Sequence, residues 1–272
     1  METIRLNSGV DMPCIGFGTW ELSRSEALSS VAVALQTGYR LIDTAKIYGN
    51  EDTVGQAIMQ SGVARKDIFV TTKLWNDDQS YDAAFQALDA SLERLGLDYV
   101  DLYLIHWPAT RKRGEAWKAL VDLQKAGKTK AIGVSNYTID HLTQLLGDSD
   151  TIPAVNQVEF HPYIYEQQRE LLEYCKQKGI TIEAYSPLAR VSKDAPSQVN
   201  EIAGKLGKTE QQVFLRWCIQ HGTIPLPRSR DPEHIASNFD VFDFELSDED
   251  MNQLNNISDG DRVTWDPAGM GS

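Results

Sequence analysis

The sequence predicts an α/β protein, a (β/α)8 TIM barrel with an N-terminal β-hairpin and a C-terminal tail. Short runs rich in β-branched and aromatic residues alternate with longer segments that have apolar residues at helical spacing. There are eight such runs, and eight strand–helix units close naturally into a barrel. No linker or shift in composition divides the 272 residues, so we expect a single domain over residues 1–272.

The expected strands follow a turn-rich start that suits a hairpin. They lie near Ile15 and at residues 39–44, 68–73, 99–106, 130–135, 154–159, 181–185 and 223–227. The segments between them have helical periodicity, and Gly38, Gly96 and Gly179 stand at or just past the ends of three of these segments. Glycine fits there because many helices end at a left-handed residue. Strands that alternate with helices pair in parallel, so functional residues are expected where the strands end.

Composition and charge limit the kinds of partner. A net charge of -13 disfavours nucleic acid and anionic membrane surfaces, which leaves a small molecule as the expected partner. The N-terminal residues have no apolar signal region, and no run is long enough for a membrane helix, so a cytoplasmic location is expected. Cys14, Cys175 and Cys218 are far apart and lack C-x-x-C spacing, so they are interpreted as buried thiols, and no metal site is expected.

Four ionisable side chains lie at or just beyond the ends of three consecutive expected strands. Asp43 and Tyr48 follow the first of these strands, Lys73 ends the second and His106 ends the third. Each has a plainer structural explanation when taken alone. Tyr48 could pack as an ordinary aromatic residue, Lys73 could extend into water, Asp43 could cap a turn and His106 could be a core histidine. Stability alone does not explain why all four stand at one barrel mouth.

Together these four side chains suggest proton transfer to a carbonyl oxygen. Lys73 would pair with Asp43, and its ammonium would lower the pKa of the Tyr48 phenol from a reference value of about 10. That shift would favour proton donation by Tyr48 near neutral pH. A neutral His106 imidazole could hydrogen-bond the same oxygen, which gains charge as its carbon is attacked.

The motifs LIDTAxxYxNE, TTKLW and LIHWP resemble those of the aldo-keto reductase family, and the resemblance runs from about Gly16 to Asn238. It implies that Asp43, Tyr48, Lys73 and His106 form the family's catalytic tetrad. The implied activity is NADPH-dependent reduction of aldehydes or ketones to alcohols, with Tyr48 as the proton donor. Short loops make the chain similar to bacterial 2,5-diketogluconate reductase and aldehyde reductase members. Small aldehydes, methylglyoxal or diketo sugar acids are the expected substrates, and a monomer is expected.

The resemblance also implies how NADPH binds, extended across the barrel mouth. Tyr185 would stack on the nicotinamide, while Ser135, Asn136 and Gln157 would hold its carboxamide. The other cofactor residues that the resemblance implies are Gly18, Thr19, Trp20, Asp43, Ser186, Leu188, Arg228, Ser229, His234 and Asn238. A Rossmann-type site is not supported, because Gly16-Phe17-Gly18 lacks the third glycine at the required spacing.

One departure from the family pattern concerns the cofactor phosphate. The chain has IPLPRSRDPEHIASN where the family commonly has I-P-K-S and a later arginine. Arg228 replaces the lysine, and together with Ser229 it can bind a phosphate. His234 stands where the arginine is usual and is mostly neutral at pH 7. We therefore predict that NADPH is preferred and that NADH is tolerated.

Trp20, Trp75 and Trp107 follow the first, third and fourth expected strands. The resemblance places them in the substrate pocket with Tyr48 and His106, although a lone tryptophan more often packs at the rim. The C-terminal tail is expected to close one side, with Trp265 as a further contact.

Two other functions remain open. A non-enzymatic module could bind NADPH and sense its redox state, although the intact tetrad disfavours this. A barrel enzyme for phosphorylated sugars would need a glycine-rich phosphate loop after the last two strands, where the chain has Pro227-Arg228-Ser229.

Overall fold

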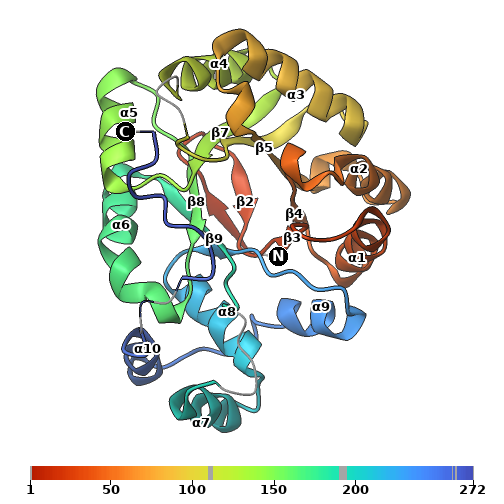
Figure 1. The fold of residues 1–272 in the computed structure, drawn as a ribbon. Coiled ribbons are helices and arrows are strands. Elements are labelled where there is room, and N and C mark those ends of the chain that lie inside the picture. The colour runs from red at the N-terminus through yellow and green to blue at the C-terminus, as the bar shows by residue number, and fades with distance from the viewer. Residues whose placement is uncertain (1, 110–112, 190–194, 259, 261, 272) are drawn as a thin grey trace.

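The computed structural model describes residues 2–109, 113–189, 195–258, 260 and 262–271. Eight parallel strands stand side by side in chain order, as the sequence predicted, and helices surround them (Figure 1). The strands are β3 (Phe17–Gly18), β4 (Leu41–Asp43), β5 (Phe69–Leu74), β6 (Val100–Ile105), β7 (Thr129–Ser135), β8 (Val155–Glu159), β9 (Thr181–Tyr185) and β10 (Ile224–Pro225). The first strand begins two residues later than Ile15, the position around which it was expected.

Backbone hydrogen bonds close the sheet into a barrel. The amide of Gly16 donates to the carbonyl of Pro225 at 3.0 Å, and that of Gly18 donates to Pro227 at 3.0 Å. A Cβ atom on Gly16 would lie 2.6 Å from the side chains of Leu41 and Leu226. Glycine is therefore needed where the first strand meets the last, and the predicted (β/α)8 architecture is confirmed.

Ten α-helices occur in the described chain. They are α1 (Arg24–Thr37), α2 (Glu51–Gln60), α3 (Tyr81–Leu95), α4 (Arg113–Lys125), α5 (Ile139–Asp148), α6 (Tyr165–Lys178), α7 (Ser197–Leu206), α8 (Glu210–Gln220), α9 (Pro232–Phe239) and α10 (Asp248–Asn255). Gly38, Gly96 and Gly179 follow α1, α3 and α6 with positive φ angles of 123°, 64° and 69°. The predicted ends of these three helices are confirmed.

The barrel interior has an apolar floor. Leu6 and Met12, from the N-terminal hairpin, pack against inward-facing side chains such as Leu41, Leu104 and Ile224. The hairpin consists of β1 (Thr3–Arg5) and β2 (Asp11–Pro13), and Figure 1 shows β2 through the centre of the barrel. A second and larger apolar core lies between the strands and the helices. Because the hairpin closes the amino end, the carboxyl ends of the strands form the mouth that is left for a site.

Cys14, Cys175 and Cys218 are buried free thiols, as predicted. None of the helices in the described part of the chain has the length and apolar character needed to cross a membrane.

The contact between α2 and α3 provides a test of the packing. A Cβ atom on Gly55 of α2 would lie 2.0 Å from the carbonyl oxygen of Leu95 in α3. We expect Gly55→Ala to lower the free energy of unfolding by about 1–3 kcal/mol, because the helices would have to separate. Urea denaturation would measure this loss.

Gly204→Ala in α7 is the matched control, because a Cβ atom there would meet nothing within 4 Å. It should leave the free energy of unfolding unchanged or raise it by up to about 1 kcal/mol. Equal losses in the two variants would contradict the packing argument.

Candidate active site

Polar side chains fill the barrel interior above the apolar floor. Asp43 ends β4, Lys73 lies near the end of β5 and His106 directly follows β6. Alternate residues of a barrel strand point inward, so these side chains meet at the mouth. Tyr48 comes from a short 3₁₀ turn, η1 (Lys46–Tyr48), which ends at Gly49 with a left-handed φ of 68°.

An ion pair between Lys73 and Asp43 lies at the centre of this cluster. The Lys73 Nζ atom lies 2.6 and 2.7 Å from the two carboxylate oxygens of Asp43. It also donates to the Thr44 carbonyl at 3.0 Å and to the Tyr48 hydroxyl at 3.2 Å. The Lys73 side chain is fully buried and that of Asp43 is 5% exposed. The structure therefore brings Asp43, Tyr48 and Lys73 into direct contact, as the sequence predicted.

The protonation states follow from burial and from these contacts. Burial lowers the pKa of Lys73, but Asp43 and Tyr48 raise it above its ordinary value, so the ammonium stays charged. Burial raises the pKa of Tyr48 to about 12, although Lys73 lowers it. The prediction that Lys73 brings the Tyr48 pKa below 10 is therefore wrong for this structure, because burial and the charge of Asp43 outweigh the ammonium. Tyr48 carries its proton at neutral pH, which is the form a proton donor needs.

His106 lies beside the phenol. Its ring centroid is 5.8 Å from that of Tyr48 and 5.2 Å from that of Trp75. Burial and the Lys73 charge hold its pKa well below the ordinary value, so the imidazole is neutral. Its buried Nδ1 atom has no hydrogen-bond partner among the described residues.

Two of the three predicted tryptophans, Trp20 and Trp75, contact this cluster. Trp20 contacts Tyr48 with a centroid distance of 4.8 Å, and its side chain is half exposed. The Trp75 ring lies next to His106. The ring centroid of Trp107 lies 6.0 Å from that of Trp265 in the C-terminal tail. The mouth therefore has aromatic walls next to the ionisable groups.

Gln157 and Glu183 extend the polar cluster across the barrel. The Gln157 amide nitrogen donates to Asp43 at 2.9 Å and to Glu183 at 2.9 Å. Gln157 was predicted as a cofactor contact, whereas Glu183 was not predicted at all. The signal for Glu183 was an acidic residue at the inward-facing position of an otherwise apolar strand, TIEAY.

The predicted nicotinamide contacts lie at the ends of β7, β8 and β9. Ser135 donates to the Gln157 carbonyl at 2.8 Å, and the Asn136 amide donates to the His106 carbonyl at 3.0 Å. The Tyr185 hydroxyl donates to Asn136 at 2.8 Å. These amide and hydroxyl groups suit a carboxamide, and the partly exposed ring of Tyr185 suits a stacked nicotinamide.

Backbone strain marks the same edge of the barrel. The non-glycine residues of the described chain with positive φ are Glu21 (58°), Asn136 (64°), Ser186 (49°) and Ala189 (42°), and all follow the carboxyl ends of strands. Such strain concentrates at functional sites, because the surrounding structure must stabilise it.

The remaining predicted cofactor residues flank this edge. Thr19 is buried, and its hydroxyl donates to the Asp43 carbonyl at 2.9 Å. Gly18 precedes it in β3, and Leu188 is partly buried after β9.

The predicted phosphate residues gather beside the start of α1, but acidic groups are among them. Arg228 lies 3.2 Å from the Glu21 carboxylate, and Arg230 pairs with Glu26 at 3.2 Å. Ser229 accepts from the amide of Asp231, which caps α9. The positive charges of Arg228 and Arg230 are therefore partly offset by acidic side chains. In α9 itself, His234 is exposed and Asn238 is buried.

Glu159 of β8 fastens the C-terminal tail to the mouth. Its buried carboxylate accepts from the Val263 amide at 2.6 Å and from the Thr264 hydroxyl, and it lies 3.7 Å from Arg262. Burial raises the Glu159 pKa, but hydrogen bonds from His161, Thr264 and Val263 hold it below the ordinary value. Thr264 also bonds the Tyr185 hydroxyl at 3.0 Å. Sequence reasoning missed this anchor, which fixes the tail beside the candidate cofactor site.

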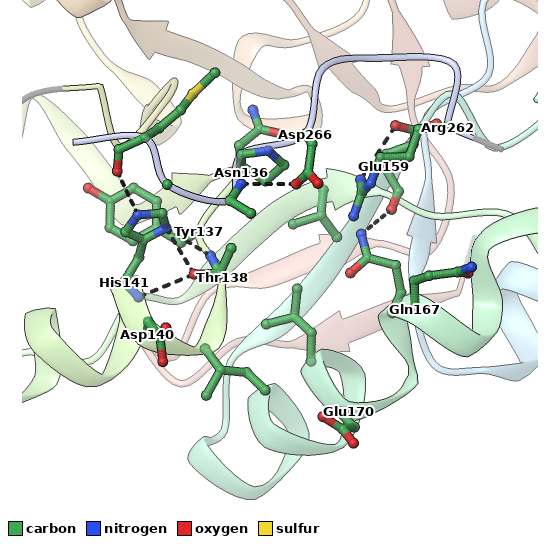
Figure 2. A pocket seen from close by; sticks show the side chains of 18 of the residues that line it. Asn136, Tyr137, Thr138, Asp140, His141, Glu159, Gln167, Glu170, Arg262 and Asp266 are labelled. Carbon is green, nitrogen blue, oxygen red and sulfur yellow. Dashed lines mark hydrogen bonds and ion pairs between the residues drawn. The ribbon is translucent and has the colours of Figure 1, made fainter. Parts of the chain in front are cut away.

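A cavity of about 450 Å³ lies under the tail, next to α5 and α6. Figure 2 shows Arg262 directed toward Glu159 on one side of it and His141 on the other. Asn136 and Glu159 line the cavity, whereas the four tetrad residues do not. The cavity therefore adjoins the mouth without being the cleft in which the tetrad lies.

Similarity to known proteins identifies the family of this chain. The model of the Aldo/keto reductase family matches residues 14–259. The chain belongs to the aldo/keto reductase family. It is 48% identical over 267 residues to a glyoxal reductase of Bacillus subtilis, which covers 98% of this chain and 96% of the relative. It is 45% identical to a 9,11-endoperoxide prostaglandin H2 reductase of Trypanosoma cruzi, and the match covers 97% of this chain and 94% of that relative.

Solved structures of the family agree with the fold. An aldo/keto reductase from Brucella melitensis has a TM-score of 0.91 and 46% identity, and the match covers 94% of this chain and 99% of that one. An aldo-keto reductase from Bombyx mori in complex with NADP has a TM-score of 0.91 and 36% identity, and the match covers 97% of this chain and 94% of that one. The predicted enzyme class, an NAD(P)H-dependent carbonyl reductase, and the NADP(H) cofactor are confirmed.

The buried ion pair can be tested by substitution. Asp43→Asn keeps the shape of the side chain but leaves the buried Lys73 ammonium without its counter-charge. We expect the free energy of unfolding to fall by about 3–5 kcal/mol, as measured by urea denaturation.

Glu166→Gln is the control, because the Glu166 pair with Arg169 has both side chains about half exposed or more. This variant should lose less than about 1 kcal/mol. A loss of that small size in Asp43→Asn would show that the Lys73 charge does not depend on Asp43.

Proposed function

We propose that this family member reduces aldehyde or ketone carbonyls to alcohols with NADPH, and that Tyr48 donates the proton. The observation that carries the proposal is the Tyr48 hydroxyl, held 3.2 Å from a fully buried ammonium and next to a neutral imidazole. The similarity to a glyoxal reductase supports small aldehydes such as methylglyoxal among the substrates. Diketo sugar acids are the second class to be tested.

Each residue of the site then has a chemical role. When bound at the mouth, NADPH would provide the hydride for the carbonyl carbon. The neutral His106 imidazole hydrogen-bonds the carbonyl oxygen and orients it, and Tyr48 transfers its proton to that oxygen. The Lys73 ammonium stabilises the phenolate that remains, and Asp43 holds Lys73 in place.

The binding roles that we propose belong to side chains at the barrel mouth. Ser135, Asn136 and Gln157 hold the carboxamide, and the Tyr185 ring stacks on the nicotinamide. Trp20, Trp75 and Trp107 form the walls of the substrate pocket, and the half-exposed Trp20 leaves it open to small carbonyl compounds. The chain acts in this scheme as a single domain and a monomer.

The cofactor preference depends on Arg228. Together with Ser229 it binds the 2'-phosphate, which NADH lacks. Glu21 lies 3.2 Å from Arg228 and repels the same phosphate, so NADPH is preferred while NADH is tolerated.

Replacement of the proton donor is the test of the reaction. Tyr48→Phe removes the hydroxyl and keeps the ring, so we expect kcat with methylglyoxal to fall by about 10²–10⁴-fold while NADPH still binds. Loss of NADPH absorbance would measure turnover, and fluorescence titration would measure binding.

Tyr174→Phe is the matched control, because its hydroxyl bonds Thr143 on the outer helices. It should keep full turnover. A wild-type protein that binds NADPH tightly but reduces no carbonyl in a panel of aldehydes, methylglyoxal and diketo sugar acids would contradict the proposal and favour a redox-sensing module.

The phosphate contact predicts a difference between the two cofactors. We expect Arg228→Ala to raise the KM for NADPH by about 10-fold or more, because a charge-assisted hydrogen bond to phosphate is lost. The KM for NADH should change by less than about threefold, because that cofactor has no 2'-phosphate. Arg169→Ala on α6 serves as the control for a change of surface charge. Equal shifts for both cofactors in Arg228→Ala would contradict the role given to Arg228.

A further inference from the structure

Glu183 lies in the barrel interior beneath the tetrad. It belongs to β9 and is paired in register with Gln157 of β8 and Ile224 of β10. Its side chain is fully buried, and one carboxyl oxygen accepts from the Gln157 amide at 2.9 Å. The other oxygen is buried and has no hydrogen-bond partner in the described chain. The roles proposed for the tetrad and for the cofactor residues do not involve the Glu183 carboxyl group.

The surroundings of Glu183 favour a neutral carboxylic acid. A buried carboxylate needs a cation or several donors, but the nearby Lys73 ammonium is bound to Asp43. Among the described residues Gln157 supplies its hydrogen bond, and the same Gln157 nitrogen also donates to the Asp43 carboxylate. Burial, and then the charge of Asp43, raise the pKa of Glu183 to about 8. The group is therefore protonated at neutral pH.

An unbroken series of contacts joins Glu183 to the candidate proton donor. Gln157 links Glu183 to Asp43 at 2.9 Å on each side, Asp43 holds Lys73 at 2.6 Å, and Lys73 contacts Tyr48 at 3.2 Å. The titratable groups that act on Glu183 are Asp43 and Lys73, and Tyr48 is affected by Glu183 in turn. The paired residue on the β10 side, Ile224, is apolar.

We propose that Glu183 is a positioning residue of the reductase site. As a neutral acid it fixes the Gln157 amide, and through that amide it fixes the Asp43–Lys73 pair that holds Tyr48. The inference rests on the proposed function, because it treats Tyr48 as the proton donor. When Glu183 ionises, its negative charge raises the Tyr48 pKa and weakens Tyr48 as an acid. Carbonyl reduction should therefore slow as pH rises through the ionisation of Glu183.

The pH profile of Glu183→Gln tests this role. Glutamine keeps the oxygen that accepts from Gln157 and cannot ionise. We expect the kcat of the variant at pH 7 to stay within about threefold of wild type, since the hydrogen bond is retained. The wild-type kcat should fall through about pH 8, and this fall should be missing in Glu183→Gln. An identical fall in both proteins would overturn the inference.

Glu159→Gln is the matched control. It removes an equally buried carboxylate from the neighbouring strand, but one that bonds the tail and His161 instead of Gln157. The kcat of this variant should still fall near pH 8, as in the wild type. If both substitutions remove the fall, the effect is not specific to Glu183 and the inference fails.

Thermal unfolding without cofactor gives a second measurement that does not depend on activity. An acid whose pKa is higher in the folded state than in the unfolded state stabilises the fold at low pH, and this stability is lost as pH rises toward the folded pKa. The Tm of Glu183→Gln relative to wild type should therefore increase from pH 6 to about 8 and change little above that. A Tm difference that is constant with pH would contradict a neutral Glu183.

Glu183→Leu separates hydrogen bonding from charge. It removes the acceptor of the Gln157 amide, so we expect kcat at pH 7 to fall about 10-fold or more below that of Glu183→Gln. Equal activity of the two variants would contradict positioning through Gln157. If Glu183→Leu does not fold, the pH profile and Tm of Glu183→Gln decide the matter.

These experiments separate failure of the inference from failure of the proposed function. A wild-type protein that reduces no carbonyl compound overturns the proposed function and with it the role of Glu183 in reduction. A wild-type protein that reduces methylglyoxal, with the same pH profile in Glu183→Gln, overturns only the inference.

Discussion

The buried ion pair of Lys73 and Asp43 is the interaction on which the site depends. Removing both charges from water is costly, so the pair persists only where good geometry and further hydrogen bonds offset that cost. Here both carboxylate oxygens contact the ammonium, and Thr44, Tyr48 and Gln157 supply the remaining contacts. The neutral form of His106 and the protonated form of Tyr48 both follow from this buried arrangement, because burial acts on each of them. The polar cluster of this reductase would therefore be unstable outside a closed barrel.

The barrel separates the groups that stabilise the fold from those that carry chemistry. The hairpin and the apolar floor close the amino end, and the hydrogen bonds of Gly16 and Gly18 close the sheet. Polar and strained residues gather at the opposite end, where Asn136 and Ser186 have positive φ angles. The tail is tied to this end through Glu159, and Thr264 connects it to Tyr185. The candidate cofactor and substrate residues therefore lie mostly at or just beyond the carboxyl ends of the strands.

The sequence predicted the strands and the tetrad because both depend on local patterns. Parallel strands bring their carboxyl ends together, so residues at the ends of consecutive strands meet without knowledge of any distance. Other features depend on contacts between distant segments, which one sequence does not reveal. The pair of Arg228 with Glu21 joins positions 207 residues apart, and the fastening of the tail by Glu159 joins positions about 105 apart. The predicted direction of the Tyr48 pKa shift was wrong, because that direction depends on whether burial outweighs the Lys73 ammonium. The extent of burial also depends on contacts between distant segments.

Burial keeps Tyr48 in its protonated, proton-donating form at neutral pH, even though the Lys73 ammonium beside it lowers its pKa. Carbon-13 NMR of protein labelled at tyrosine Cζ would test this protonation state most directly, with the Tyr48 signal assigned by its loss in Tyr48→Phe. The account predicts a signal at the position of a neutral phenol that does not move between pH 6 and about 9, since the Tyr48 pKa is raised to about 12. A titration with its midpoint near neutral pH would show that the ammonium outweighs burial and would contradict the account.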